Sequence, residues 1–288
     1  MEIKSLDHLS IDEITDSFLE AFSDYAVHFT HNQVKSILRR RGFCPMLTFG
    51  MFDNGKLVSF VFNGIGIKDG IPTAYDTGTG TIKSYRGQGL AAEIFRHTEK
   101  RLVKQGIARY LLEVLCDNQP AIALYKKLGF EIEREFICYA APAKNIATSA
   151  GNATRDIILR VTTNSNAIQS ESYHDYSPSW QSCYASVLRA NEELSCIGAW
   201  IHGEFAGYAI GDARQGELAQ LAVRRDLRRR GIGTALLEHF VSTMQTDSIK
   251  ILNVDARCGS MISFLERMNI GISSRQYEMS KNLSQDKI

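Results

Sequence analysis

Two short glycine turns, each led by an arginine, stand at corresponding places in the two halves of the chain. The first is Arg86-Gly87-Gln88-Gly89-Leu90-Ala91, and the second is Arg228-Arg229-Arg230-Gly231-Ile232-Gly233. Each turn follows a strand-like run and opens an amphipathic helix, so free N–H groups and the positive end of the helix dipole point at one spot. Such a spot binds anions, phosphate groups above all. The repetition predicts one fold used twice, with a phosphate-bearing ligand in at least one copy.

The elements that position the first turn follow from local signals. Capping boxes at Ser10–Glu13 and Thr30–Gln33 predict two helices. Asp53-Asn54-Gly55 predicts a hairpin turn between two strands. The further expected elements are strands over 73–82, 109–115 and 130–139, and helices over 87–105 and from about 119 to 129.

The second half repeats this order of elements. Strands are expected over 156–161, 195–201, 205–211, 217–223 and 249–254, and helices over 180–190, 231–245 and 260–268. Hairpins followed by alternating strands and helices predict a mixed α/β sheet. The small and polar residues over 140–154 show no period, which is typical of a linker. We therefore expect domains at 1–140 and 155–288, joined by a linker over 141–154.

Composition sets limits on the class of protein. The 288 residues suit two domains, and 44% hydrophobic with 23% charged residues is ordinary for a globular chain. A net charge of +1 gives no argument for nucleic acid or an anionic membrane as partner. The six cysteines lack metal-ligand spacing, so no metal is expected. The absence of a signal-peptide pattern and of a long apolar run predicts a cytoplasmic protein.

Other phosphate and RNA motifs fit the turns less well. Neither turn is a P-loop, because no Lys-Ser/Thr follows the glycines. Gly87, Gly89 and Ala92 also match the dinucleotide-binding pattern, with Glu113 as its ribose acid, but several elements come first here. The basic run over 224–230 suggests RNA, yet acidic and apolar residues interrupt it and no aromatic platform accompanies it.

Two motifs in register carry a family resemblance. Arg86-x-x-Gly89-x-Ala91 and Arg228-x-x-Gly231-x-Gly233 resemble the acetyl-CoA pyrophosphate loop of the GNAT acetyltransferases. Residues 118–130, NQPAIALYKKLGF, resemble that family's second signature, Asn-x-x-Ala-x-x-Leu-Tyr-x-x-x-Gly-Phe. The resemblance covers 1–140 well, and 155–288 through one motif and the element order. It implies two tandem GNAT-like α/β domains, with CoA held where two parallel strands splay apart. The second domain either binds CoA as well or serves only the fold.

The resemblance also implies acetyl-CoA as acyl donor and assigns its ligands. The cofactor-binding candidates are Thr79, Thr81, Arg86, Gly87, Gln88, Gly89, Leu90, Ala91 and Asn118 in the first half, and Leu221, Val223, Arg228, Arg229, Arg230, Gly231, Ile232, Gly233 and Thr234 in the second. Arg86 could bond the pyrophosphate, or be a solvated side chain at a helix start. Asn118 could bond the pantetheine, or simply cap its helix.

Direct transfer of an acetyl group to an amine needs a base and benefits from an acid. An amine with a pKa of about 10.4 is almost entirely protonated at neutral pH, whereas the departing thiolate is already a fair leaving group. The family signature makes Tyr125 the acid candidate, and Glu113 is the base candidate. Glu113 lies in an apolar strand, and its spacing to Tyr125 resembles that in ribosomal-protein alanine acetyltransferases. A core tyrosine and a solvent-facing glutamate are the alternatives.

Two further acids and the second copy complete the predicted chemistry. Asp76 and Asp24 could bind a cationic amine or act through water. In the second half, Asn253, Leu265 and Cys258 stand where the first has Glu113, Tyr125 and Asn118, and Asn269-Ile270 replaces Gly129-Phe130. Base, acid and helix stop are thus altered while the loop is kept, although Asp255 could serve as another base. We therefore expect catalysis in the first half.

The expected function is acetyl transfer from acetyl-CoA to a primary amine of a small molecule, by a monomer or homodimer without a nucleic-acid or membrane partner. Acetylation of a protein N-terminus or lysine is one alternative. A CoA-responsive binding protein without turnover is another. The acceptor is not encoded in any motif.

Overall fold

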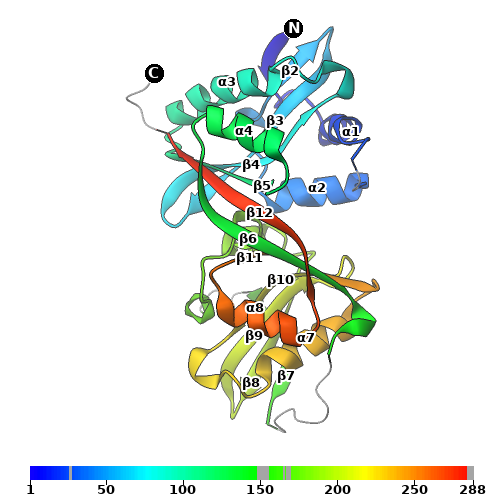
Figure 1. Cartoon of the computed structure of the whole chain (residues 1–288), viewed down its shortest axis with the longest axis vertical. Coiled ribbons are helices and arrows are strands. Elements are labelled where there is room, and N and C mark those ends of the chain that lie inside the picture. The colour runs from blue at the N-terminus through cyan, green and yellow to red at the C-terminus, as the bar shows by residue number, and fades with distance from the viewer. Residues whose placement is uncertain (26–27, 148–155, 165, 167–169, 284–288) are drawn as a thin grey trace. The chain divides into compact units, whose positions relative to one another are not determined.

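The computed structural model describes residues 1–25, 28–147, 156–164, 166 and 170–283. Its strands form a mixed sheet in the order β1-β2-β3-β4-β5-β12-β6-β11-β10-β9-β8-β7, which confirms the α/β fold class (Figure 1). The chain divides into two compact units, which we call unit 1 (Met1–Glu133 with Tyr277–Ile288) and unit 2 (Arg134–Gln276). The predicted domain limits at 140 and 155 follow the sequence repeat and stay a prediction.

Unit 1 is a sheet covered on both faces. Its strands are β1 (Glu2–Ser5), β2 (Phe49–Asp53), β3 (Lys56–Lys68), β4 (Ile71–Thr81), β5 (Arg109–Leu115) and the end of β12 (Gly271–Asn282). Its helices are α1 (Ile11–Ala21), α2 (His31–Arg40), α3 (Leu90–Lys104) and α4 (Gln119–Lys127). Helices α1 and α2 share a core with Phe60 and Phe62, whereas α3 and α4 share one with Val61, which lies between them on β3. Because side chains alternate along β3, the two cores lie on opposite faces of the sheet.

Local sequence signals predict most of these elements. Ser10 and Thr30 form the predicted capping boxes of α1 and α2. Asn54 (φ 48°) and Gly55 (φ 82°) make the predicted hairpin turn. Helix α3 begins at Leu90, later than predicted, because Gly87 and Gly89 take left-handed backbone angles (both φ 77°) that a helix cannot contain.

Unit 2 repeats the sheet with its own helices. Its strands are β6 (Glu131–Pro142), β7 (Ile158–Thr162), β8 (Ser195–Ile201), β9 (Glu204–Asp212), β10 (Glu217–Val223), β11 (Ser248–Asp255) and the start of β12. Its described α-helices are α6 (Tyr184–Arg189), α7 (Ile232–Thr243) and α8 (Gly259–Arg267). Helices α7 and α8 pack on one core cluster that includes Leu236, Phe240 and Leu265.

Three sequence-based expectations need correction. Strand β6 continues through Ala141 to Pro142, where Ala141 pairs with Ile249 of β11, so the predicted linker begins with strand. The predicted helix over 180–190 is a 3-10 turn (Trp180–Ser182) followed by α6, because Cys183 is extended between them. Strand β12 was not predicted, since its polar sequence GISSRQYEMSKN lacks a clean apolar alternation. The predicted linker continues with a 3-10 turn (Ala143–Asn145), and its residues 148–154 lie outside the described residues.

None of the helices in the described ranges combines the length and apolar character that a membrane crossing requires.

Candidate functional site

Strands β4 and β5 pair over a short parallel ladder. The paired residues are Thr73 with Arg109, Ala74 with Tyr110 and Tyr75 with Leu111, although β4 continues to Thr81 and β5 to Leu115. Both strands therefore continue past the last pair of the ladder, and residues 76–81 of β4 lie beyond the paired region. The first glycine turn begins just after this edge, so the predicted splay and the predicted phosphate loop are neighbours.

The N-terminus of α3 differs from those of the other helices of unit 1. Its N-cap, Gly89, has no side chain to accept from the first-turn N–H groups, whereas Ser10, Thr30 and Asn118 cap α1, α2 and α4. A Cβ added to Gly87 or Gly89 would meet nothing within 4 Å. Open space and uncapped N–H groups at one helix start fit a pyrophosphate.

Unit 2 repeats this geometry with one strained residue. The β10–β11 ladder has a single parallel pair, Glu217 with Lys250, and Gly231 (φ 84°) is the N-cap of α7 without a side-chain cap. Arg229 takes the left-handed angle (φ 64°) that Gly87 takes in unit 1. A non-glycine residue is strained there, and such strain is often found at ligand sites.

A cavity of about 500 Å³ opens beside the second loop. It is bordered by residues 173–176, the end of β10, the glycine loop and the start of α8. All but Arg230 of the second-half cofactor-binding candidates lie on its wall: Leu221, Val223, Arg228, Arg229, Gly231, Ile232, Gly233 and Thr234.

The side chain of Arg86 is directed to protein partners. Its Nε donates to the Thr81 carbonyl (3.0 Å), and its Nη2 donates to the Ala21 carbonyl (2.9 Å). Nη1 and Nη2 also bind the two oxygens of Asp24 (2.8 and 2.7 Å), and this bond lowers the pKa of Asp24. The role of Arg86 at a pyrophosphate stays a prediction, as does a substrate-binding role for Asp24.

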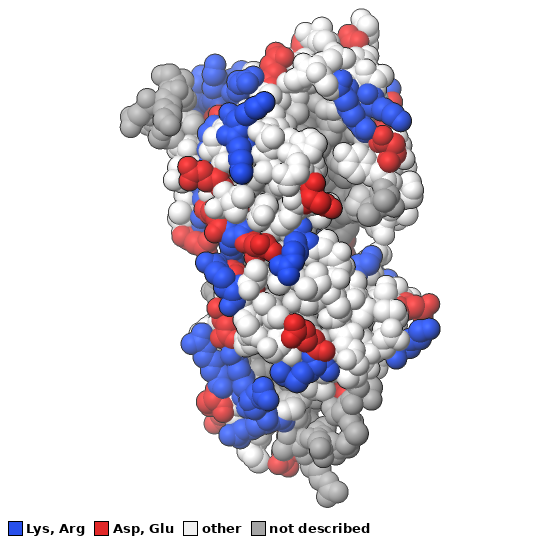
Figure 2. Space-filling model, viewed as in Figure 1, with Lys and Arg blue, Asp and Glu red and all other residues white. Residues whose placement is uncertain are grey.

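Arg228 makes a similar set of bonds in unit 2, with one bond to its aspartate where Arg86 has two. Its Nε donates to the Val223 carbonyl (3.0 Å), its Nη1 to Asp175 (2.6 Å) and its Nη2 to the Tyr173 carbonyl (2.7 Å). Within the basic run, Arg224 is paired with Glu204 and Asp226, and Arg225 with Asp175. On the face drawn in Figure 2, cationic and anionic side chains are interspersed.

Asp76, Thr79 and Tyr125 come together on the face of the sheet that α3 and α4 cover. Thr79 Oγ1 donates to Asp76 (2.7 Å), the Gly78 N–H donates to its other oxygen (2.9 Å), and the Tyr125 hydroxyl hydrogen-bonds Asp76. Burial raises the pKa of Asp76 to about 6, against these bonds and the charge of Arg41, which lower it. Burial and the charge of Asp76 raise the pKa of Tyr125, so its hydroxyl keeps its proton.

A bulge in β4 explains why Asp76 and Thr79 share a face. Three positions apart in a regular strand, they would point to opposite faces. The β3–β4 register shifts between Phe62 and Asn63, and Thr77 is the extra residue on β4. The sequence offered no signal for this bulge, which is why Asp76 was predicted as a secondary candidate rather than beside Tyr125.

Glu113 lies on the opposite face from Tyr125. Leu111 is the partner of Tyr75 and shares its face with Glu113, and Glu113 hydrogen-bonds the Tyr75 hydroxyl. Burial and the charge of Glu113 raise the pKa of Tyr75. Glu113 and Tyr125 thus flank the splay from its two sides, and their catalytic roles stay predictions.

Other first-half candidates have local partners. Asn118 caps α4 by accepting from the Ala121 N–H (3.2 Å). Thr81 Oγ1 bonds Ser59 Oγ (2.7 Å), so its side chain is turned to β3. The remaining loop candidates, Gln88, Leu90 and Ala91, lie at or beside the start of α3.

The second copy has helices and strands that correspond to those of this site, but it lacks the acid and base side chains. Cys258 and Leu265 hold the places of Asn118 and Tyr125, because α8 begins and runs as α4 does. Asn253 bonds Ser179 Oγ through its Nδ2 (3.1 Å). Burial raises the pKa of Asp255, but hydrogen bonds from Arg257 and the charge of Arg134 lower it further, to about 2. Asp255 is therefore a weak base.

The helix stop of the second copy is retained, contrary to the sequence-based expectation. Asn269 takes the left-handed angle (φ 58°) that Gly129 (φ 86°) takes after α4. Asparagine tolerates this conformation better than other non-glycine residues.

His174, whose lack of ligand spacing in the sequence predicts no role at a site, borders the cavity of unit 2. Its Nε2 lies 2.7 Å from the Tyr208 hydroxyl, and burial lowers the pKa of His174 to about 4. Spacing along the chain does not reveal this position, because the residues that surround His174 in the cavity come from distant segments. Within the described residues, no group of three or more His, Cys, Asp or Glu side chains could hold a metal ion.

The chain is similar to known acetyltransferases. The model of the acetyltransferase (GNAT) family matches residues 10–130 and 165–268. The chain is 34% identical over 86 residues to N-alpha-acetyltransferase MAK3 of Arabidopsis thaliana, a match that spans 30% of this chain and 45% of that one. It is 36% identical over 61 residues to mycothiol acetyltransferase of Corynebacterium aurimucosum, spanning 21% of this chain and 20% of that one. These matches therefore cover less than half the length of either relative.

The fold also resembles a solved tandem protein. A tandem GNAT protein from the clavulanic acid biosynthesis pathway superposes with a TM-score of 0.72 at 15% identity, covering 98% of this chain and 99% of that one. At this identity the likeness concerns the fold alone.

Proposed function

The chain belongs to the acetyltransferase (GNAT) family, and we propose that it transfers an acetyl group from acetyl-CoA to the primary amine of a small molecule. The observation that carries the proposal is the placement of Tyr125 and Asp76 beside an interrupted β4–β5 ladder that leads into an uncapped helix start. An uncapped helix start that can bind an anion, next to a buried tyrosine–carboxylate pair, fits an acyl thioester of a phosphate-bearing carrier.

The loop residues of unit 1 would hold the donor. Backbone N–H groups over 87–91 would bind the pyrophosphate, and the edge of β4 beyond the ladder would bind the pantetheine arm. When bound, acetyl-CoA supplies an activated acetyl group on sulfur. Asn118 already caps α4, so we assign it to positioning that helix rather than to the donor.

The residues of unit 1 can handle both protons of the reaction. Glu113, on the face with α1 and α2, would take a proton from the incoming ammonium, directly or through water. The free amine then forms the C–N bond as the C–S bond breaks. Tyr125, on the other face, would donate a hydrogen bond to the departing sulfur. In the free protein this hydroxyl hydrogen-bonds Asp76, which orients it. Because the hydroxyl has a single proton, it would turn from Asp76 to the sulfur as the thiolate leaves.

Unit 2 would bind CoA without this chemistry. Its loop and cavity fit the pyrophosphate, but Asn253 stands where unit 1 has the base Glu113, and Leu265 stands where it has the acid Tyr125. Asp255 is held ionised by arginines. Catalysis is therefore assigned to unit 1. The expectations of a cytoplasmic location and of a monomer or homodimer stay predictions.

Protein acetylation is the second candidate. The relative N-alpha-acetyltransferase MAK3 acts, by its name, on an α-amine, and the Glu113–Tyr125 spacing favours the same class. A CoA-binding protein without turnover is the third.

One experiment separates the three candidates. Binding of acetyl-CoA is measured by calorimetry, and free thiol release is then followed over a panel of small amines and of peptides with free N-termini or lysines. Release with small amines supports the proposal, release with peptides alone supports protein acetylation, and tight binding without release supports the non-enzyme. Absence of acetyl-CoA binding would contradict all three.

A further inference from the structure

The arginine that leads each glycine turn makes the same type of contact in both units. In unit 1 its guanidinium is paired with Asp24, and in unit 2 with Asp175. We call these contacts the latches. Each latch joins the phosphate loop to a segment far away in the sequence. In each, the arginine also donates to two backbone carbonyls, those of Thr81 and Ala21 in unit 1 and those of Val223 and Tyr173 in unit 2.

The latch engages most of the hydrogen-bonding capacity of Arg86. A guanidinium has five N–H donors, and the bonds to Thr81, Ala21 and Asp24 use Nε, Nη1 and Nη2. The bidentate pair with a carboxylate is the strongest arrangement an arginine makes with a protein group. A phosphate would have to displace Asp24 to gain the same bonds.

The segment held by this latch lies on the acceptor side of the sheet. Phe18 of α1 would come within 3.2 Å of a Cβ at Gly78, and Phe22 within 3.1 Å of one at Gly80. The missing side chains at these two glycines let the end of α1 lie close on β4. This face is the one that carries Glu113, opposite the face of Tyr125.

We propose that Arg86 is a positioning residue: through Asp24 and Ala21 it fixes the end of α1 against the donor loop, so that the acceptor amine and the thioester meet in one geometry. The inference rests on the proposed function of unit 1. It assigns binding of the pyrophosphate to the backbone N–H groups of the loop rather than to the guanidinium.

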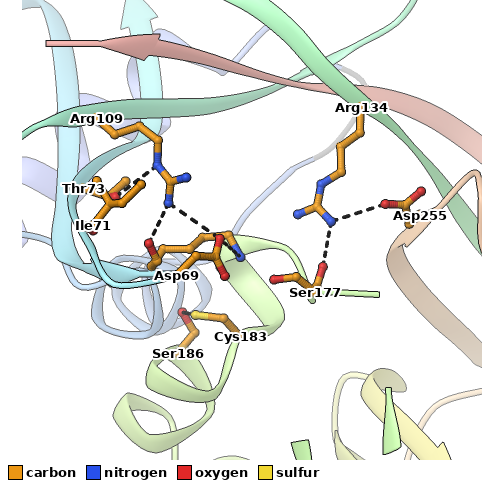
Figure 3. Close-up of polar contacts among 10 residues, drawn as sticks. Asp69, Ile71, Thr73, Arg109, Arg134, Ser177, Cys183, Ser186 and Asp255 are labelled. Atoms are coloured by element: carbon orange, nitrogen blue, oxygen red, sulfur yellow. Dashed lines mark hydrogen bonds and ion pairs between the residues drawn. The ribbon is translucent and has the colours of Figure 1, made fainter. Parts of the chain in front are cut away.

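In unit 2, further bonds hold the segment that the latch contacts. Asp175 also accepts from Ser260 Oγ (2.7 Å). Arg134 binds the Ser177 carbonyl (2.7 Å) and Asp255 (3.4 Å), and Figure 3 draws these two contacts. The segment over 173–177, which borders the cavity, is thus fixed at several points. The recurrence of the latch in a copy without the acid and base indicates that it serves loop geometry rather than proton transfer.

The test is a double-mutant cycle in the full chain. The variants are Asp24→Asn, Arg86→Gln and both together, with Asp12→Asn as control, because Asp12 of α1 forms an exposed ion pair with Lys35 of α2 that is not part of the latch. For each, the acetyl-CoA Kd is measured by calorimetry, kcat and KM by thiol release, and amide hydrogen exchange over residues 18–23.

The latch predicts that both single variants lower kcat/KM for the acceptor by about tenfold, that the double variant is no worse, and that the acetyl-CoA Kd stays within about twofold. Amides over 18–23 should lose protection in all three and keep it in Asp12→Asn. If Arg86→Gln weakens acetyl-CoA binding about tenfold while Asp24→Asn does not, the arginine is a phosphate ligand and the inference is wrong.

Hydrogen exchange separates this inference from the proposed function. If the wild-type protein transfers acetyl groups to no amine, the proposed function fails, yet lost protection over 18–23 would still support the latch. Unchanged protection in both single variants would overturn the latch whatever the turnover.

Discussion

The Tyr125 hydroxyl on α4 hydrogen-bonds the buried carboxylate of Asp76 on β4. The bulge at Thr77 turns Asp76 and Thr79 to the same face, where both side chains are hydrogen-bond neighbours of the Tyr125 hydroxyl. This pair ties the second signature motif to the strand that leads into the glycine loop. The proposed acid and the proposed donor site therefore share one rigid frame.

Stability should depend on pH through Asp76. Its pKa of about 6 in the folded protein lies above the unfolded value, so the folded state gains stability from its protonation below about pH 4 and loses it as pH rises through 6. A shift of about two units corresponds to about 3 kcal/mol. Relative to wild type, Asp76→Asn should therefore gain about 2–3 kcal/mol in unfolding free energy between pH 4 and pH 7, measured by urea unfolding. An equal difference at both pH values would show that Asp76 is not shifted.

Removing the proposed base should slow transfer most where the amine is protonated. Glu113→Gln is expected to lower kcat by about 10²–10⁴ at pH 7, with the acetyl-CoA Kd unchanged. The loss should shrink near pH 9.5, where more of an amine with a pKa of about 10.4 is already neutral. Thiol release across this pH range is the measurement, with the exposed Glu131→Gln as control. A deficit that does not vary with pH would argue against Glu113 as base.

The two loops should respond in opposite ways to exchange of one residue. Arg229→Gly removes a left-handed non-glycine residue (φ 64°) and is expected to leave stability unchanged or raise it by up to about 1 kcal/mol. Gly87→Arg places a side chain at φ 77° and should cost about 1–2 kcal/mol. Urea unfolding of both variants checks this. If the two changes have the same sign, backbone strain does not govern this position.

Much of unit 1 could be predicted from sequence because its signals are local. Capping boxes, the Asn54-Gly55 turn and the Asn118 cap act within a few residues, and the structure contains each of them. The glycine turns were identified correctly as helix starts for the same reason.

The missing parts depend on long-range pairing. Strand β12 lies between β5 and β6 in the sheet, an order that no local pattern encodes, and its own sequence is polar. The bulge at Thr77 and the latch from Arg86 to Asp24 join residues whose proximity exists only in the folded chain. Likewise, Asn269 stands where the first copy has Gly129, yet its backbone adopts the same left-handed conformation.

The central claim is that unit 1 performs acetyl transfer with Tyr125 assisting the departing sulfur. Its most direct test is thiol release from acetyl-CoA, with the best amine of the panel, by wild type, Tyr125→Phe and Tyr139→Phe. The control removes the hydroxyl of a buried tyrosine in unit 2 that has no hydrogen-bond partner among the described residues. The account predicts that Tyr125→Phe lowers kcat by about 10²-fold or more with acetyl-CoA binding intact, while Tyr139→Phe matches wild type. Undiminished turnover in Tyr125→Phe would contradict it.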